Sequence, residues 1–197
     1  MITDPGVFSE VRRDCLPVGA DLPIFGCLSP APMNLSQQIA KHVRDTYTGG
    51  NWTSSSYRQH LADVTWQEAV TKIGSFNTLL TLVWHTTYYL TAVRKVLEGE
   101  PLHAKDAWSF DHPPVGSAEE WDAILQKTWQ EAEAFAALVE QLPESRLNEA
   151  FIDGQYGTWF RNLEGIVEHS HYHLGQIVLL KKMLRQWPLP EPLLPDA

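Results

Sequence analysis

Four long stretches of this chain repeat their apolar residues every three or four positions, the spacing of an α-helix with one buried side. They cover residues 35–47, 75–99, 117–142 and 158–185. No stretch alternates apolar and polar residues clearly enough for a half-buried strand, and residues 153–157 indicate a turn or a short hairpin. An amphipathic helix must bury its apolar side against other elements. The sequence therefore predicts an all-α fold, a four-helix bundle.

Residues that favour helix ends mark several of these limits. Gly49 and Gly50 are expected to end the first helix, since glycine readily follows a helix C-terminus. Ser117 and Glu120 match a capping box at the start of the third helix. Thr158 is a good N-cap for the fourth helix.

The buried sides and the connections predict how the helices are arranged. Leu35 opens the buried side of the first helix and Phe76 that of the second. Short helical turns are expected between them, over residues 56–61 and 66–70. The link over residues 99–116 is 18 residues long, which is long for antiparallel neighbours but fits a crossover along the length of a bundle. The predicted topology is therefore up-down-down-up.

Proline separates both ends of the chain from the helical region. Residues 1–32 hold five of the 13 prolines and both cysteines, and residues 188–197 hold four more prolines. We expect a weakly ordered N-terminal extension, a folded domain over residues 33–187 and a Pro-rich C-terminal tail. Cys15 and Cys27 are interpreted as surface thiols rather than as a disulfide or a two-thiolate metal site.

The charge balance narrows the choice of partners. Fifteen Lys and Arg against 24 Asp and Glu give a formal net charge of −9, which disfavours nucleic acid or an anionic membrane surface as the main partner. No apolar run approaches the roughly 20 residues of a membrane span. The N-terminus carries no recognisable secretory signal, so we expect a soluble, cytoplasmic protein.

The fourth helix carries the strongest chemical signal, which is a pair of histidines four residues apart. At about 100° per residue, His169 and His173 lie one turn apart on one face, the spacing with which a helix offers two imidazoles to one metal ion. His171 lies about 160° from both and is excluded from the set. The shared face borders the apolar stripe of Ile166 and Ile177, so it is predicted to face the other helices.

A metal ion usually needs a third protein ligand, and His85 in the apolar second helix is the candidate. Taken alone, a histidine on an apolar helix face is more often a hydrogen-bonded core residue. Here, however, the two histidines of the fourth helix need a third metal ligand from another helix. Three histidines without a carboxylate leave an open coordination position, which is typical of catalytic metal ions. The other histidines are interpreted as surface residues: His42, His60, His103 and His112.

Two segments of the chain resemble the DinB-like superfamily of metal-dependent enzymes: LLTLVWHTTYYLTAVRKVLEGEPL and LEGIVEHSHYHLGQIVLLKKML. The resemblance covers about residues 33–185, and its most specific part is H-x3-H followed by Leu-Gly-Gln. It implies a four-helix bundle that binds one divalent ion, zinc or nickel, through His85, His169 and His173. It also implies a homodimer. Some members transfer or isomerise low-molecular-weight thiols.

The leading functional hypothesis is a thiol S-transferase, in which a metal-activated small-molecule thiol attacks an electrophile. Tyr89, Asn162 and Gln176 are expected to line the cleft beside the three histidines. Two alternatives use the same ligands: a metal-binding or stress-response protein without turnover, and a metal-dependent hydrolase that activates water. No general base or thiol-binding residue stands at a spacing that would separate the three.

Overall fold

The computed structural model describes residues 32–186, and this part of the chain is helical without a strand, which confirms the predicted all-α class. Apart from Pro32, the predicted extension over residues 1–32 and the tail over residues 188–197 lie outside the described residues. None of the described helices is both long and apolar enough to cross a lipid bilayer. The elements are α1 (Leu35–Thr48), α2 (Tyr57–Leu61), α3 (Trp66–Val70), α4 (Leu79–Leu97), the 3-10 helix η1 (Asp106–Phe110), α5 (Ala118–Gln141), the 3-10 helix η2 (Glu144–Asn148) and α6 (Trp159–Gln186).

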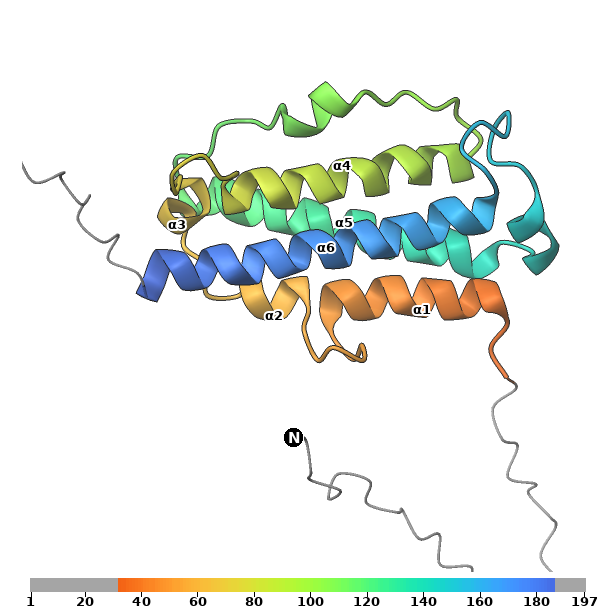
Figure 1. Cartoon of the computed structure of the whole chain (residues 1–197), viewed down its shortest axis with the longest axis horizontal. Coiled ribbons are helices and arrows are strands. Elements are labelled where there is room, and N and C mark those ends of the chain that lie inside the picture. Colours follow the sequence, from red (N-terminus) through yellow and green to blue (C-terminus); the bar gives the residue numbers. More distant parts are fainter. Residues whose placement is uncertain (1–31, 187–197) are drawn as a thin grey trace, which may run out of the picture. The chain divides into compact units, whose positions relative to one another are not determined.

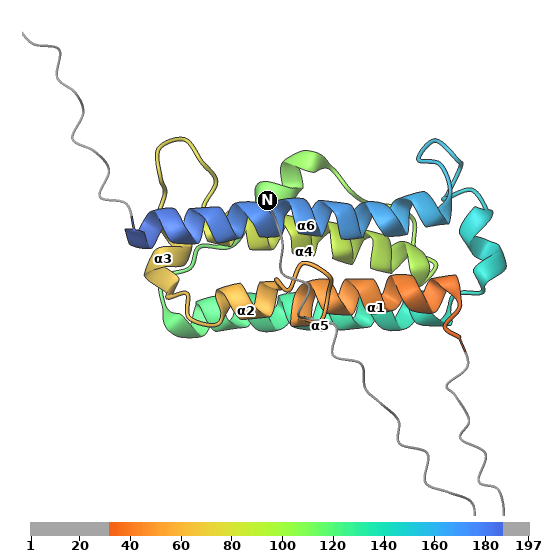
Figure 2. The same ribbon diagram turned by 60° about the horizontal axis from the view of Figure 1, so that its bottom comes forward.

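The four long helices lie side by side (Figure 1, Figure 2), and α1 and α4 each pack against both α5 and α6. The colours in Figure 1 show that α1 and α6 run in one direction, whereas α4 and α5 run in the opposite one. The segment between α4 and α5 therefore returns along α4, and η1 within this segment packs against α4. Among the short helices, α2 contacts α1 and α6, while α3 contacts α4 and α5.

The core between these helices is apolar and is filled from all four of them. Each fully buried Leu, Ile or Phe contributes about 1.5–3 kcal/mol to folding. Side chains that are almost completely buried include Ile39, Leu90, Phe135, Leu163 and Ile177. Burial of apolar side chains thus stabilises the packing of the long helices without any ligand.

Two tyrosines hold α6 beside α1 and α2. The rings of Tyr47 and Tyr57 stack with their centroids 4.6 Å apart. Tyr57 donates a hydrogen bond to the backbone oxygen of Ser170 (2.8 Å), and the hydroxyls of Tyr47 and Ser170 are 3.0 Å apart. All three side chains are buried, so losing one of these bonds leaves a polar group unsatisfied at a cost of about 1–3 kcal/mol. Because Ser170 follows His169, these bonds also position α6 at the predicted metal site.

Two apolar residues at predicted helix starts are more exposed than the sequence suggested. The second long helix, α4, begins at Leu79 rather than at residue 75, because the Thr78 hydroxyl accepts a backbone hydrogen bond (3.1 Å) from its first turn. Phe76 precedes this cap and is 55% exposed, so its predicted burial is wrong. Leu35 is the first residue of α1 and is 37% exposed, because a helix end is covered by fewer neighbours than its middle.

The N-caps predicted for the third and fourth long helices are present, although one of them differs in detail. The Ser117 hydroxyl accepts the backbone N–H of Glu120 (3.2 Å), but the Glu120 carboxylate accepts from Gly116 (2.6 Å), so only half of the capping box is present. Thr158 caps α6 as predicted, since its hydroxyl accepts a backbone N–H from the first turn (3.2 Å). Residues 153–157 form a turn beside a single antiparallel bridge.

Candidate metal centre

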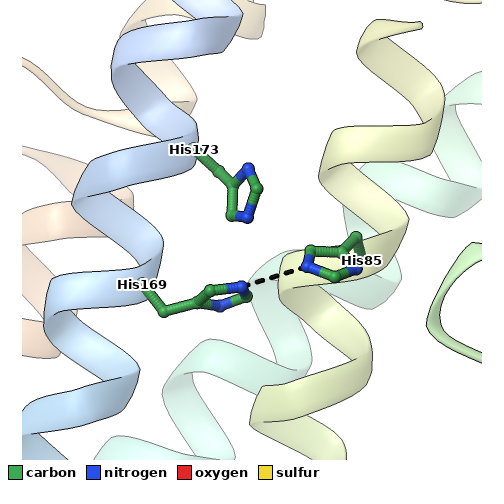
Figure 3. A group of neighbouring side chains, drawn as sticks. All are labelled: His85, His169 and His173. Atoms are coloured by element: carbon green, nitrogen blue, oxygen red, sulfur yellow. Dashed lines mark hydrogen bonds between the residues drawn. The ribbon is translucent and has the colours of Figure 1, made fainter. Parts of the chain in front are cut away.

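Three imidazoles meet between α4 and α6 (Figure 3). His85 comes from α4, and His169 and His173 come from successive turns of α6. The Nε2 atoms of His85 and His169 are 3.0 Å apart, and the ring centroids of the three pairs lie 4.5–4.9 Å apart. One nitrogen from each ring lies within 4.8 Å of the other two. The structure thus brings together the three histidines that the sequence indicates.

Burial keeps these imidazoles uncharged. His85 is 6% exposed and His173 is 9% exposed. Burial is the main cause that lowers the pKa of all three rings, and it lowers the pKa of His169 to about 4, with the neighbouring rings adding to the effect. At neutral pH each ring therefore has an unprotonated nitrogen, and neutral imidazole is the form that binds a metal ion.

Hydrogen bonds fix which nitrogen of His85 carries the proton. Nδ1 of His85 is 2.8 Å from the hydroxyl of Ser109, a buried residue of η1. That hydroxyl donates its own proton to the backbone oxygen of Asp106 (2.6 Å), so it can only accept from His85. His85 therefore carries its proton on Nδ1. Its Nε2 lone pair is directed at the other two histidines.

The two histidines of α6 are held differently. Nδ1 of His173 lies 2.7 Å from the amide oxygen of Gln176, which is an acceptor, so this ring also carries its proton on Nδ1 and leaves Nε2 free. Nδ1 of His169 is buried and has no hydrogen-bond partner among the described residues. Because Nε2 of His85 is an acceptor, the hydrogen bond between the two rings (3.0 Å, Figure 3) is donated by Nε2–H of His169, and Nδ1 of His169 is left as a buried acceptor without a partner, which is costly. A shared cation would take the place of this proton between the two Nε2 atoms.

The donor set fits a four-coordinate divalent ion. Zinc–nitrogen bonds of about 2.0–2.1 Å in a tetrahedron place two ligand nitrogens about 3.3 Å apart. The pair formed by His85 and His169, at 3.0 Å, is close to this value, and the remaining nitrogens lie within 4.8 Å. Three neutral imidazoles leave the fourth position for a water or a substrate, as in catalytic zinc sites.

A cleft of about 460 Å³ opens beside His85 and His169. Tyr89 and Asn162, two of the three residues expected there, line it. Gln176 does not. It bonds His173 and lines a separate, more apolar pocket with the loop before α4.

One wall of the cleft is a hydrogen-bonded pair of side chains. Tyr89 donates its hydroxyl proton to the Asp106 carboxylate (2.8 Å). Burial, together with this bond, raises the pKa of Tyr89 to about 12, so the phenol stays protonated at neutral pH. The apolar side chains of Val93 and Ile166 complete the wall near α4 and α6.

The remaining histidines lie outside this group. His171 donates from Nδ1 to a backbone oxygen one turn earlier (3.1 Å), and its ring lies 5.4 Å from that of His42. His42 and His103 are exposed, as the sequence suggested. His60 and His112 are only half-exposed, and each forms a hydrogen bond with a hydroxyl group (2.8 and 3.1 Å).

Sequence reasoning missed the contribution of the crossover to the site. Ser109 and Asp106 both come from η1, and Phe110 stacks on the His85 ring with centroids 4.6 Å apart. No periodicity marks these residues, because the crossover is mostly irregular. Arg161 also lines the cleft and was not singled out, although its spacing of eight residues from His169 places it near the same face of α6.

Comparison with protein-family models, with curated proteins and with solved structures finds no match, so the account of this site rests on the chain's own residues.

Proposed function

We propose that this chain is a divalent-metal-dependent enzyme that transfers a low-molecular-weight thiol to an electrophile. The observation that carries the proposal is the convergence of His85, His169 and His173, with the Nε2 lone pairs of His85 and His173 fixed by hydrogen bonds at Nδ1. Such preorganised imidazoles favour zinc or nickel, for which imidazole is a suitable ligand. The cleft beside the group supports a reactive rather than a purely structural ion.

The proposed fold class is an up-down-down-up four-helix bundle, in agreement with the resemblance to the DinB-like superfamily. Two observations support it: α4 and α5 run parallel, and the segment between them returns along α4. In this arrangement the ligands come from the packed pair α4 and α6, as in other bundles that hold a metal ion between facing helices.

A divalent ion bound here would supply one chemistry, the stabilisation of a thiol in its anionic form at neutral pH. The chain's own residues do the rest. Val93 and Ile166 offer an apolar surface to the electrophile, while the protonated hydroxyl of Tyr89 and the Asp106 carboxylate form the polar wall. In the transfer, the thiol gives its proton to solvent, its sulfur bonds to the electrophilic carbon, and the leaving group departs with the bonding electron pair.

The test is a thiol panel combined with metal analysis. Wild-type protein, reconstituted with zinc or nickel, should hold close to one ion per chain and should consume a chromogenic electrophile only when a thiol is present. His85→Ala should lose both the ion and the activity. His171→Ala is the matched control on α6 and should keep both, because its ring lies outside the group.

Each other outcome favours one alternative. Full metal occupancy without turnover for any thiol would favour a metal-binding protein. Turnover that needs the ion but no thiol would favour a hydrolase, since a bound ion can also lower the pKa of water to about 7. Failure to bind any ion after reconstitution would contradict the site itself.

A further inference from the structure

The cleft beside the three histidines has one positively charged side chain in its lining, that of Arg161. Arg161, Gly165 and His169 follow one another at intervals of four residues, so they lie near one face of α6. A Cβ atom built at Gly165 would lie 3.3 Å from Nη1 of Arg161. The guanidinium group therefore lies against the helix at Gly165, about 6 Å along the helix axis from His169.

Arg161, one of six arginines in the described part of the chain, is held only by a weak contact. Its carboxylate contact is a single N–O pair with Glu168 at 3.3 Å, between side chains that are 66% and 70% exposed. Exposed pairs of this kind contribute little to stability. The other five arginines have a carboxylate within 2.8 Å or lie over an aromatic ring: Arg44, Arg58, Arg94, Arg146 and Arg185.

Two other polar side chains of the cleft, those of Tyr89 and Asn162, are already engaged as donors. Tyr89 gives its hydroxyl proton to Asp106 (2.8 Å). The amide nitrogen of Asn162 donates to the backbone oxygens of Tyr156 and Thr158 (2.9 and 2.8 Å). Arg161 is thus the charged donor of this cleft whose existing contact is long and exposed enough to be exchanged for a ligand.

We propose that Arg161 binds an anionic group, a carboxylate or a sulfonate, on the small-molecule thiol whose sulfur lies at the three histidines. This inference rests on the proposed function and narrows its substrate class to thiols that carry an acid group. A planar guanidinium holds such an anion through two parallel N–H···O bonds, which fix direction as well as charge. The substrate anion takes the place of Glu168, and Gly165 leaves room for the guanidinium to lie along the helix toward His169.

The test compares an acidic thiol with its neutral isostere by calorimetric titration of the zinc-loaded full-length protein. Mercaptopropionate should bind about tenfold more tightly than mercaptopropionamide, as expected for one charge-assisted contact. In Arg161→Gln this preference should vanish through weaker binding of the acid alone. Added salt should weaken the binding of the acid but not that of the amide, because salt screens an exposed charge contact. Mercaptoethanesulfonate distinguishes the two anions: a sulfonate bound as tightly as the carboxylate means that charge alone is recognised.

Two glycines of α6 offer a matched control. Gly165→Ala should reduce the preference for the acid at least threefold, because its Cβ crowds Nη1 of Arg161. Gly175→Ala, where a Cβ would meet nothing within 4 Å, should leave the preference unchanged. Arg146→Gln is the control for loss of positive charge outside this cleft, because Arg146 lines a different pocket.

The outcomes separate this inference from the function on which it rests. Equal binding of acid and amide to the wild-type protein, or equal weakening of both in Arg161→Gln, would overturn the role of Arg161 while thiol binding at the ion still stands. Absence of binding by every thiol to the zinc-loaded protein would overturn both proposals.

Discussion

Ser109 offers the sharpest test of how this chain prepares a metal site, because it touches a predicted ligand without being one. Its hydroxyl accepts from Nδ1 of His85 (2.8 Å) and donates to the Asp106 backbone oxygen (2.6 Å), and its side chain is fully buried. Ser109→Ala removes both bonds while barely changing the side-chain volume. The ring of His85 is then free to carry its proton on either nitrogen.

Two separate losses follow from that substitution. Without the hydroxyl, Nδ1 of the buried His85 has no partner, so the free energy of unfolding should fall by about 1–3 kcal/mol. Residues that orient a ligand histidine typically contribute 10–100-fold to metal affinity. We therefore expect the zinc dissociation constant to rise by about 10–100-fold, equivalent to roughly 1.4–2.7 kcal/mol.

The assay is competition for zinc against a chromogenic chelator at neutral pH, with urea unfolding of the metal-free protein measured in parallel. Thr128→Val is the matched control, because the Thr128 hydroxyl is equally buried and bonds the Thr87 hydroxyl (2.8 Å) rather than a histidine. The control should lose stability but keep its zinc affinity. Loss of affinity of the same size in both variants would refute the reasoning, since it would trace the effect to general destabilisation rather than to His85.

Three further predictions concern the ligands, the ion and acid stability. His173→Ala should abolish metal binding whereas His171→Ala should preserve it, measured by elemental analysis after reconstitution; equal losses would contradict the assignment of faces on α6. Removing the ion with a chelator should abolish thiol transfer but leave the helical circular dichroism signal, because the apolar core packs without it; collapse of the signal would make the ion structural. The hydrogen bonds from Arg185 lower the pKa of Glu68 to about 2, below its ordinary 4.5, so this pair stabilises the folded chain above about pH 4.5 and the contribution is lost as pH falls toward 2. Denaturant titrations between about pH 5 and 2 should therefore show that the free energy of unfolding falls less for Glu68→Gln than for wild type. An equal fall in both proteins would contradict the stabilising role of this pair.

Periodicity alone predicted the number and extent of the long helices, because a buried helix side repeats its apolar residues over many turns. Periodicity was inaccurate at the helix ends, because a few capping residues decide where a helix begins and ends. Asn34 and Gln37 form a complete capping box before α1, which explains why Leu35 lies at the exposed rim rather than in the core. At α4 the helix was expected to start at residue 75, but Thr78 caps it, so it begins at Leu79.

The three histidines could be predicted because two of them follow from helix geometry alone. The spacing of His169 and His173 fixes their common face without any knowledge of the fold. His85 required one further assumption, that the second long helix packs against the fourth, and α4 does pack against α6. The hydrogen bond of Ser109 to His85 and the stacking of Phe110 on its ring could not be predicted, because both depend on the path of an irregular segment over a helix.

The length of that segment explains why it can take part in the site at all. Parallel α4 and α5 require the chain to return along α4, whose 19 residues span about 28 Å. The 20 residues between Leu97 and Ala118 could reach about 66 Å if fully extended. The topology therefore uses less than half of this reach, and the surplus allows the chain to coil into η1 directly over His85. A crossover shortened to the minimum span would still connect the helices. It would leave His85 without the hydroxyl of Ser109 that fixes its proton and without the ring of Phe110 that covers it, so the connection demanded by the topology also prepares the site.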